Sequence, residues 1–254
     1  MSPIAVTIAG SDSGGGAGIQ ADLKTFSALG VYGASVITAL TAQNTKGVTA
    51  IHDVPADFIT AQIDAVFSDL AVSAVKIGMV SQSPVIEAIA TGLERWRQRK
   101  VVLDPVMIAA SGDRLLAPDA IDTLKRVLIP RALVITPNLP EAAALLEAPI
   151  ASTETQMREQ AERLLALGAK AVLIKGGHGS GPESVDLLVE PTSLTRLAAD
   201  RVATENTHGT GCTLSSAIAA ASAAKAYVSA AIAAAERIEI GSGHGPVHHF
   251  HAWW

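Results

Sequence analysis

The chain has 254 residues and a formal net charge of −5 at pH 7, and 49% of its residues are hydrophobic against 17% charged. This apolar content is enough for a large core and excludes a mainly disordered chain. The 24 acidic and 19 basic side chains exclude a strong electrostatic surface for nucleic acid or an anionic membrane. A single cysteine excludes an internal disulfide and a multi-cysteine zinc site, and no basic region precedes the first apolar run, so we expect a cytoplasmic protein.

Near-continuous apolar runs recur along the chain and predict strands that are buried on both faces. They cover residues 4–9, 34–40, 74–77, 101–103, 132–135, 171–174 and 185–189. Segments with apolar residues at helical spacing alternate with them, at residues 19–29, 58–67, 84–96, 119–128, 141–146, 157–167 and 213–224. This order predicts one α/β domain over residues 1–254, with a mainly parallel sheet covered on both sides by crossover helices.

The most apolar long stretch, residues 214–235, consists largely of alanine and serine and contains Lys225. Alanine contributes little to membrane insertion, and a charge near the centre of a span is costly. We therefore expect two helices in this stretch and no membrane span.

Glycine, proline or polar residues follow six of the predicted strands. Open parallel sheets bind ligands at the carboxyl ends of their strands, so these positions predict a small-molecule site along one edge of the sheet. The positions are residues 10–12, 41–44, 78–79, 104–107, 136–138 and 175–178.

A glycine-rich segment, residues 14–18, lies between the first predicted strand and helix. Gly16, Gly18 and Ala21 match the loose G-x-G-x-x-A pattern of a dinucleotide loop. No acidic residue stands about 20 positions further on to bind a ribose, which disfavours a nicotinamide site. Close approach of the backbone to another ligand, or simply a tight turn, remains open. A P-loop is excluded because the chain contains no Gly-Lys pair.

A second glycine-rich segment, residues 206–212, opens directly into a helical pattern. Gly209 and Gly211 flank Thr210, so successive N–H groups can turn toward one point, where the helix start adds free donors and partial positive charge. Such an anion hole would stabilise a phosphoryl group during its transfer. The alternative is a glycine-rich helix entry without a ligand.

Cys212 lies in the first turn of that predicted helix. A lone cysteine is commonly an inert small hydrophobe. A helix N-terminus favours the thiolate, however, and predicts a pKa below the usual value of about 8.5. The thiolate could then accept the proton of a substrate hydroxyl that attacks phosphorus.

Oxygen-bearing side chains also follow neighbouring predicted strands. Asp104, Asn138 and Glu141 suit Mg²⁺ held largely through water beside nucleotide phosphates. The spacing of Asn138 and Glu141 equally predicts a capping box at a helix start, and both roles are compatible. Lys175 could reach phosphate oxygens, or it could be a solvated lysine at a strand end.

Four of the seven histidines fall in residues 243–254. No cysteine or acidic residue accompanies them, which disfavours a native metal site. We expect instead that Trp253 and Trp254 dock against the body of the protein.

Eight longer motifs are distributed over the chain. They are TIAGSD at residues 7–12, ADLKTF at 21–26, AQNT at 42–45, KIGM at 76–79, TPNLPE at 136–141, KGGH at 175–178, HGTGC at 208–212 and HHFHAWW at 248–254. Together they resemble one known family, the hydroxymethylpyrimidine/phosphomethylpyrimidine kinases of thiamine biosynthesis, within the ribokinase-like superfamily. The resemblance runs essentially from end to end.

The resemblance implies a three-layer α/β/α fold and transfer of the γ-phosphoryl group of MgATP to 4-amino-5-hydroxymethyl-2-methylpyrimidine, and then to its monophosphate. It implies that the amide of Gln43 pairs with the edge of the ring, since an amide offers both a donor and an acceptor. The other implied substrate contacts are Gly10, Asp22, Met79 and Val106.

The resemblance also assigns the phosphoryl-transfer side of the site. Cys212 would be the general base, where most ribokinase-like sugar kinases carry aspartate, and Gly209, Thr210 and Gly211 would form the anion hole. Lys175, Thr136 and Asn138 would contact phosphate, and Asp104 and Glu141 would hold Mg²⁺.

Two alternative functions belong beside this expectation. Pyridoxal kinases share the Gly-Thr-Gly-Cys loop and act on a similar ring alcohol, and a ligand-binding regulator could keep the pocket without turnover. We expect small-molecule partners, no nucleic acid and no membrane. A homo-oligomer is expected, with a dimer favoured, although no motif specifies it.

Overall fold

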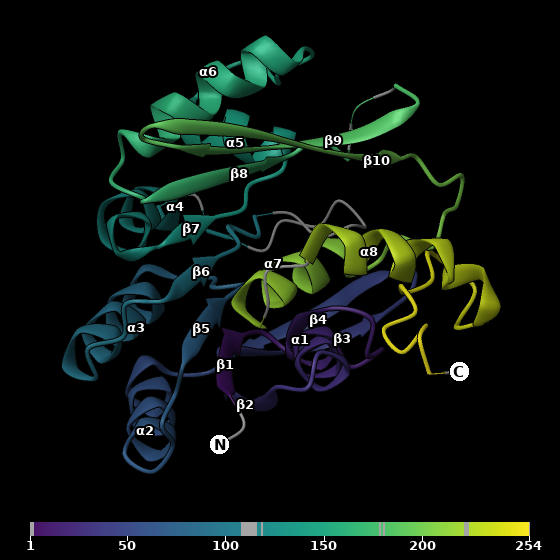
Figure 1. Cartoon of the computed structure of the whole chain (residues 1–254). Coiled ribbons are helices and arrows are strands. Elements are labelled where there is room, and N and C mark those ends of the chain that lie inside the picture. The colour runs from purple at the N-terminus through teal and green to yellow at the C-terminus, as the bar shows by residue number, and fades with distance from the viewer. Residues whose placement is uncertain are drawn as a thin grey trace.

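An eight-stranded sheet forms the centre of the computed structural model (Figure 1), in the order β10-β9-β8-β7-β6-β5-β1-β2. Neighbouring strands from β2 to β8 in this order pair in parallel, whereas β9 is antiparallel to both β8 and β10. The mainly parallel sheet expected from the sequence is confirmed. The strands are β1 (Ile4–Ala9), β2 (Tyr32–Ile37), β5 (Ala74–Ile77), β6 (Val101–Leu103), β7 (Val134–Ile135), β8 (Ala171–Lys175), β9 (Glu183–Glu190) and β10 (Ser193–Asp200).

The structure describes residues 3–107, 116, 117, 119–177, 179, 181–220 and 224–253. His178, in the motif at residues 175–178, and Trp254 lie outside these residues.

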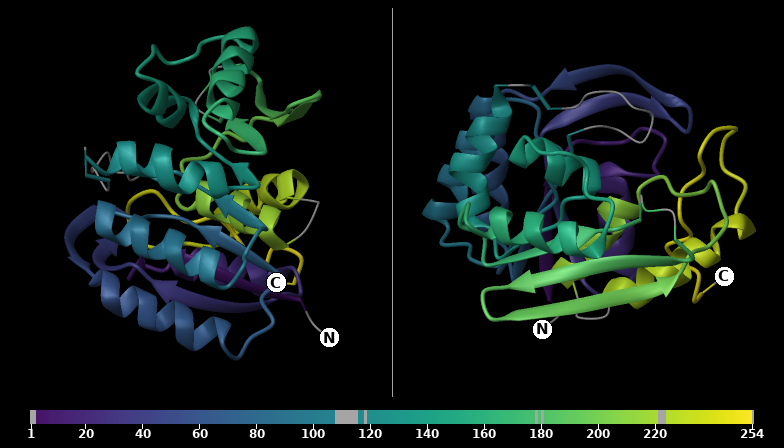
Figure 2. Two further views of the ribbon diagram at one scale, coloured as in Figure 1. Left: turned by 90° about the vertical axis from the view of Figure 1, so that its left-hand side faces the viewer. Right: turned by 90° about the horizontal axis from the view of Figure 1, so that it is seen from above.

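Helices cover both faces of the sheet (Figures 1 and 2), so the three-layer α/β/α architecture is confirmed. On one face lie α2 (Ala56–Phe67), α3 (Ser83–Arg95), α4 (Ala120–Thr123) with its π-helical continuation Leu124–Leu128 and the 3-10 turn Ile129–Arg131, α5 (Leu139–Leu146) and α6 (Glu154–Leu165). On the other lie α1 (Gly18–Ala28), α7 (Thr210–Ala220) and α8 (Ala224–Ala233), followed by a 3-10 turn, Ala235–Arg237.

Side chains on each strand alternate between the two layers of helices. In β1, Val6 and Ile8 belong to the larger core with α2 and α3, whereas Ala5 packs with Phe26 of α1. In β8, Leu173 faces the core of α7 and α8. Burial on both faces explains why these strands read as continuous apolar runs.

A separate two-stranded sheet interrupts the expected pattern. The run at residues 34–40 is not one strand, because β2 ends at Ile37 and β3 (Ala39–Asn44) begins after Thr38 and pairs antiparallel with β4 (Gly47–Asp53). Residues 41–44 therefore lie within β3 and do not follow a strand of the central sheet. The sequence analysis also missed β4 and β10, whose exposed side chains give no apolar run.

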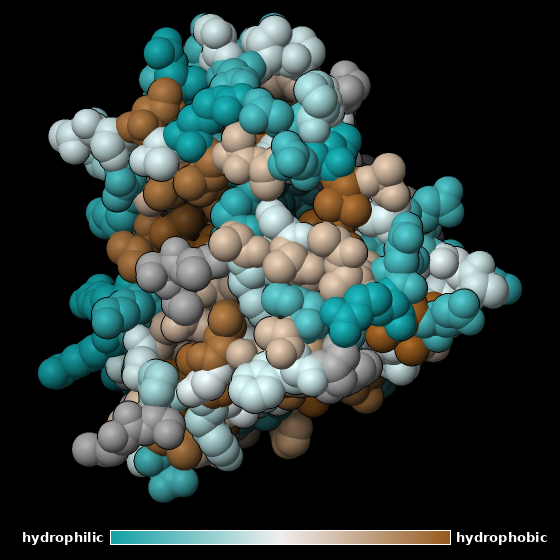
Figure 3. Space-filling view, turned by 45° about the vertical axis from the view of Figure 1, so that its right-hand side comes forward, coloured by the Kyte–Doolittle hydropathy of each residue, from teal (hydrophilic) through white to brown (hydrophobic). Residues whose placement is uncertain are grey.

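The stretch at residues 214–235 forms two helices, α7 and α8, as expected. Within the described residues, no helix is both long and apolar enough to cross a bilayer. The face in Figure 3 carries hydrophilic residues interspersed with hydrophobic ones.

The described part of the C-terminal tail docks through His249 and not through Trp253. His249 is buried, with its Nδ1 at 3.3 Å from Thr25 Oγ1 of α1, and its carbonyl accepts a hydrogen bond of 2.9 Å from Tyr227 Oη of α8. Trp253 is 74% exposed. The expectation that Trp253 docks is wrong, because the chain turns at the histidines and leaves the indole in solvent.

His249 gives the fold a defined acid sensitivity. Burial lowers the pKa of His249 to about 4, with Lys24 and His248 adding to the effect. The unfolded chain binds this proton near pH 6.5 and the folded chain only near pH 4, so the stabilisation is present above pH 6.5 and is lost as the pH falls toward 4. In urea unfolding between pH 7 and pH 4, we expect the stability of His249→Leu to fall less steeply than that of wild type. An equal slope in both proteins, with exposed His52→Leu as the control, would contradict this assignment.

Candidate active site

A fully buried ion pair lies beneath the carboxyl edge of the sheet. Lys76 of β5 donates to both carboxylate oxygens of Asp22 of α1, at 3.0 and 2.9 Å, and both side chains are 0% exposed. Thr7 of β1 and Ser216 of α7 each donate to the same carboxylate at 2.6 Å. Burial opposes the charge on Lys76, but Asp22, Cys212 and Asp104 together outweigh it and raise the pKa of the ammonium above its usual value. One carboxylate therefore joins two strands and two helices.

This arrangement places the start of α7 directly above the sheet. The first bond of the helical ladder runs from the N–H of Thr213 to the carbonyl of Gly209, at 2.8 Å. The N–H groups of Gly211 and Cys212 precede this bond, as in the first turn of any helix. The structure thus forms the expected helix entry, with unbonded donors beside Cys212, which is half-buried as a residue.

The electrostatic environment of Cys212 differs from the expectation. Burial raises the pKa of the thiol to about 11, and the carboxylates of Asp22 and Asp104 add to the rise. Lys76 and a hydrogen bond from the N–H of Gly18 act in the opposite direction but do not compensate. The prediction that the helix start lowers this pKa below about 8.5 is therefore wrong, because desolvation and two nearby carboxylates outweigh the helix.

Three charged side chains that the sequence analysis selected meet next to this turn. Lys175, at the end of β8, lies 2.8 Å from Asp104 and 3.9 Å from Glu141. A Cβ atom placed on Gly211 would lie 3.2 Å from Lys175 Nζ, in tight contact, so the turn and the ammonium lie close together. Thr136 donates to Asp104 at 2.9 Å. The start of α7 and the carboxyl ends of β6, β7 and β8 therefore enclose one polar site.

The two carboxylates of this cluster differ in protonation. Burial opposes ionisation of Asp104, but Lys175 and Lys76 outweigh it and hold its pKa below the usual value. Burial raises the pKa of Glu141 to about 7, Lys175 lowers it, and the charge of Asp104 raises it further. One carboxylate is thus firmly ionised, while the other titrates near neutrality.

Asn138 and Glu141 form the capping box that their spacing predicted. Asn138 Oδ1 accepts from the N–H of Glu141, and Glu141 Oε2 accepts from the N–H of Asn138, both at 2.8 Å. The box starts α5 and orients Glu141 toward Lys175. The capping interpretation is confirmed, and it also explains how a helix start holds a carboxylate at the site.

The glycine-rich loop at residues 14–18 is organised by Asp12, which is 1% exposed. Its carboxylate accepts from the N–H groups of Gly14, Gly16 and Ala17 at 2.8 to 3.0 Å, and His208 Nε2 lies 2.8 Å away. Burial alone would raise the pKa of Asp12, but these donors lower it. The tight-turn interpretation of the loop is favoured, because its amides are occupied by a carboxylate of the chain itself.

The residues expected to bind substrate differ in how accessible they are. Gly10 follows β1 against the side chain of Met79, since a Cβ atom on Gly10 would lie 3.2 Å from Met79 Cε. Gln43 is half-buried on β3, and its Oε1 accepts from Thr41 Oγ1 at 3.2 Å. Val106 is half-buried two residues after Asp104. Asp22, by contrast, lies below the surface with its carboxylate occupied by three side chains, and its direct contact with a substrate stays a prediction.

The sequence analysis gave no role to Lys76 or His208. A lysine within the apolar run of residues 74–77 was the available signal, because a charge inside a buried strand requires a partner. The signal for His208 was its position directly before Gly209. Its partner Asp12 is 196 residues away along the chain, and no local pattern links the two.

Comparison with known proteins was consistent over the whole chain. The family model for phosphomethylpyrimidine kinase matches residues 12–248. A hydroxymethylpyrimidine/phosphomethylpyrimidine kinase of Rhizobium meliloti is 62% identical, covering 100% of this chain and 99% of the relative. The chain belongs to the phosphomethylpyrimidine kinase family. The family resemblance and kinase activity expected from the sequence are thereby confirmed.

Solved structures support the same fold for this family member. The ADP complex of a Bacillus subtilis pyridoxal kinase has a TM-score of 0.90 and 36% identity, covering 98% of both chains. A phosphomethylpyrimidine kinase of Clostridium difficile has a TM-score of 0.75 and 49% identity, covering 86% of this chain and 89% of that one. Both vitamin kinase activities thus occur on this fold.

The contribution of the buried Lys76–Asp22 pair to the stability of this kinase can be tested by substitution. Asp22→Asn leaves the Lys76 ammonium buried without its counter-ion, which typically costs about 3–5 kcal/mol. The free energy of unfolding in urea measures this loss. As a control, Asp64→Asn breaks an exposed pair with Arg95 and should cost about 0–1 kcal/mol. Similar small losses in both variants would contradict the role of Asp22 as the anchor.

Proposed function

We propose that the chain transfers the γ-phosphoryl group of ATP to the hydroxyl of 4-amino-5-hydroxymethyl-2-methylpyrimidine, and then a second one to the monophosphate, within thiamine biosynthesis. Membership in the phosphomethylpyrimidine kinase family supports the reaction class. The observation that carries the proposal is the turn at Gly209–Cys212, which faces Lys175 and Asp104. In this proposal, residues 1–254 act as one domain, and a homodimer stays a prediction.

In the proposal, each side of the site has a separate task. Positive charge would face a phosphoryl group from two sides, from the N–H groups of Gly211 and Cys212 and from the Lys175 ammonium. Preorganised donors of this kind stabilise the charge that spreads over the equatorial oxygens during transfer. The substrate oxygen forms its bond to the γ-phosphorus as the bond to ADP breaks.

The proton of the attacking hydroxyl must leave during this step, and in the proposal the Cys212 thiolate accepts it. With a thiol pKa of about 11, only a small fraction is ionised at neutral pH, but that fraction is a strong base. A loose transition state transfers the proton late. Catalysis then relies mainly on positioning and charge stabilisation, with the base contributing a smaller share.

Asp104 and Glu141 would hold Mg²⁺ in this proposal. Within the described ranges, no group of three or more His, Cys, Asp or Glu side chains is placed to hold a metal ion. Two carboxylates nevertheless fit Mg²⁺, which usually binds one or two carboxylates and completes its shell with phosphate oxygens and water. When bound, the ion would neutralise phosphate charge, and Asn138, which holds the Glu141 carboxylate through the capping box, would keep the ligand in place. Thr136 would do the same for Asp104.

Pyridoxal phosphorylation is the second candidate function, because a pyridoxal kinase of Bacillus subtilis superposes over nearly the whole chain. The amide of Gln43 favours the aminopyrimidine. It can accept from the exocyclic amino group and donate to a ring nitrogen, and an amide that pairs with a substrate N–H discriminates strongly against analogues that lack the group.

The deciding experiment measures ADP release with MgATP and one acceptor at a time: the hydroxymethylpyrimidine, its monophosphate or pyridoxal. Products are identified by mass. We expect turnover of both pyrimidines, with kcat/KM well above that for pyridoxal. Equal or higher kcat/KM for pyridoxal would reassign the substrate, and no turnover of any acceptor would refute the kinase function in favour of a binding protein.

Cys212→Ala tests the base. We expect kcat to fall by roughly 10²- to 10⁴-fold, the usual contribution of a positioned general base, with the fold retained. Because the thiolate fraction rises about tenfold for each pH unit below the thiol pKa, wild-type kcat should keep rising with pH above the titration of Glu141 near pH 7, and the variant should lose this further rise. The same pH dependence in both proteins would exclude Cys212 as the base.

A further inference from the structure

Three alternate glycines in the C-terminal tail pack against the polar edge of the molecule. A Cβ atom on Gly241 or Gly243 would overlap Thr45, in the turn between β3 and β4, and a Cβ atom on Gly245 would overlap Asn206. Gly243 meets the backbone carbonyl of Thr45, which no side-chain rotation can move away. Only glycine allows this segment, residues 241–246, to lie so close to both loops.

Hydrogen bonds fix the same contacts. The N–H of Gly243 donates to Thr45 Oγ1 at 3.0 Å, and the N–H of Gly245 donates to Asn206 Oδ1 at 3.1 Å. The carbonyl of Gly245 accepts from the N–H of His208 at 3.1 Å, as part of a parallel bridge between His208 and Pro246. The tail therefore binds the β3–β4 turn on one side and the loop that leads into α7 on the other. Figure 2 shows the C-terminal segment beside the end of the β3–β4 hairpin.

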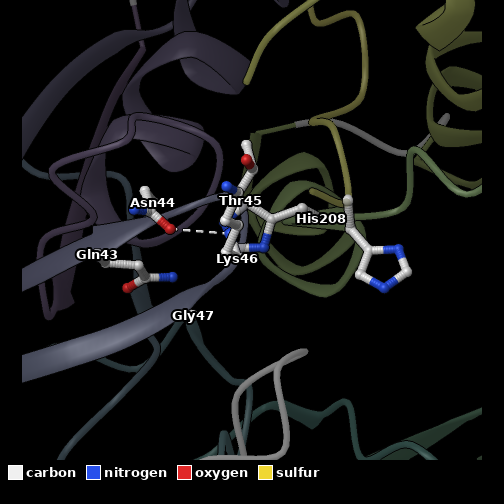
Figure 4. Close-up of a pocket in the computed structure, with 7 residues that line it drawn as sticks. Gln43, Asn44, Thr45, Lys46, Gly47 and His208 are labelled. Atoms are coloured by element: carbon white, nitrogen blue, oxygen red, sulfur yellow. Dashed lines mark hydrogen bonds between the residues drawn. The ribbon is translucent and has the colours of Figure 1, made fainter. Parts of the chain in front are cut away.

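The two loops joined in this way carry the two halves of the site. Gln43 lies two residues before Thr45, and Gly209 follows His208 directly. Both loops line one small cavity of about 20 Å³ (Figure 4), too small for more than a single water molecule. Its lining residues are Gln43, Asn44, Thr45, Lys46, Gly47, His208 and His244.

A second set of contacts also joins the β3–β4 hairpin to the loop that contains His208. Ser13 Oγ donates to the carbonyl of Gln43 at 2.9 Å and accepts from its N–H at 2.8 Å. Asp12, next to Ser13, lies 2.8 Å from His208 Nε2. The β3–β4 hairpin pairs with no described strand of the central sheet, and this loop and the tail both bind its turn end.

We propose that residues 241–246 are a positioning brace, which holds Gln43 at a fixed place relative to the anion-binding turn at Gly209. The proposal rests on the proposed function for its kinetic consequence, because Gln43 must bind the pyrimidine for its position to matter. The brace touches no reacting atom in this assignment. It sets where the ring lies relative to the phosphoryl group.

The brace predicts a selective kinetic defect. Gly243→Ala forces the tail away from the carbonyl of Thr45 and loosens the turn of the hairpin, while the two Ser13 bonds to Gln43 and the contact of Lys175 with Asp104 remain. We expect KM for the hydroxymethylpyrimidine to rise roughly 10- to 100-fold, the scale of a misplaced positioning group, with KM for ATP unchanged. Gln43→Ala, which removes the amide itself, sets the upper limit of the effect.

A matched control and a second variant accompany this test. Gly181→Ala adds the same methyl group at an exposed loop glycine with nothing within 4 Å of the new atom, and it should leave both KM values unchanged. Thr45→Val keeps the glycines and removes only the Oγ1 acceptor of Gly243. It should reproduce part of the defect even if Gly243→Ala fails to fold.

Hydrogen exchange gives a readout that needs no substrate. In Gly243→Ala, amides of residues 43–47 and 206–209 should exchange faster, while those of β5 and β6 stay protected. Unchanged exchange in these loops, or an equal rise in both KM values, would overturn the brace. If wild type does not phosphorylate the pyrimidine, the proposed function fails and the exchange data alone decide whether the tail holds the two loops.

Discussion

The buried Lys76–Asp22 pair is the constraint on which the site depends. An ammonium and a carboxylate that are both withdrawn from water are tolerable only with close pairing and further hydrogen bonds. Thr7 and Ser216 supply those bonds, and as a result β1, β5, α1 and α7 are fixed around one carboxylate. The thiol of Cys212 lies one turn before Ser216 on α7 and so takes its position from this layer. Its raised pKa comes first from burial, and the carboxylates of Asp22 and Asp104 add to the rise.

Asp12 has the corresponding role on the outer side of the site. Its carboxylate gathers the amides of the glycine-rich loop and the ring of His208, so a loop that follows β1 and a loop near the end of the chain become one wall. Two hydrogen bonds between Ser13 and Gln43 attach the β3–β4 hairpin to this wall. Asp22 thus fixes the helix start that is proposed to face phosphate, and Asp12 fixes the loops that are proposed to face the ring.

Whether a feature could be predicted from the sequence depended on how far apart along the chain the interacting residues lie. The capping box of Asn138 and Glu141 was predictable, since it is closed within four residues. The ends of β1, β5 and β6 were predictable from their apolar runs. The division of residues 34–40 into β2 and β3 was not, because the hairpin is exposed and its direction depends on contacts such as that of Thr38 Oγ1 with the carbonyl of Met79. The ionisation of Cys212 was mispredicted because its dominant cause is burial.

The sequence by itself determined the alternation of strands and helices, the kinase family and the residue types available for phosphoryl transfer, because periodicity and motifs are local properties. Only the tertiary structure decided which charges neutralise one another. Lys76 with Asp22, Lys175 with Asp104, and His208 with Asp12 are separated by 54, 71 and 196 residues. Electrostatic energy depends on distance in space and on desolvation, and both are set by the packing of the layers.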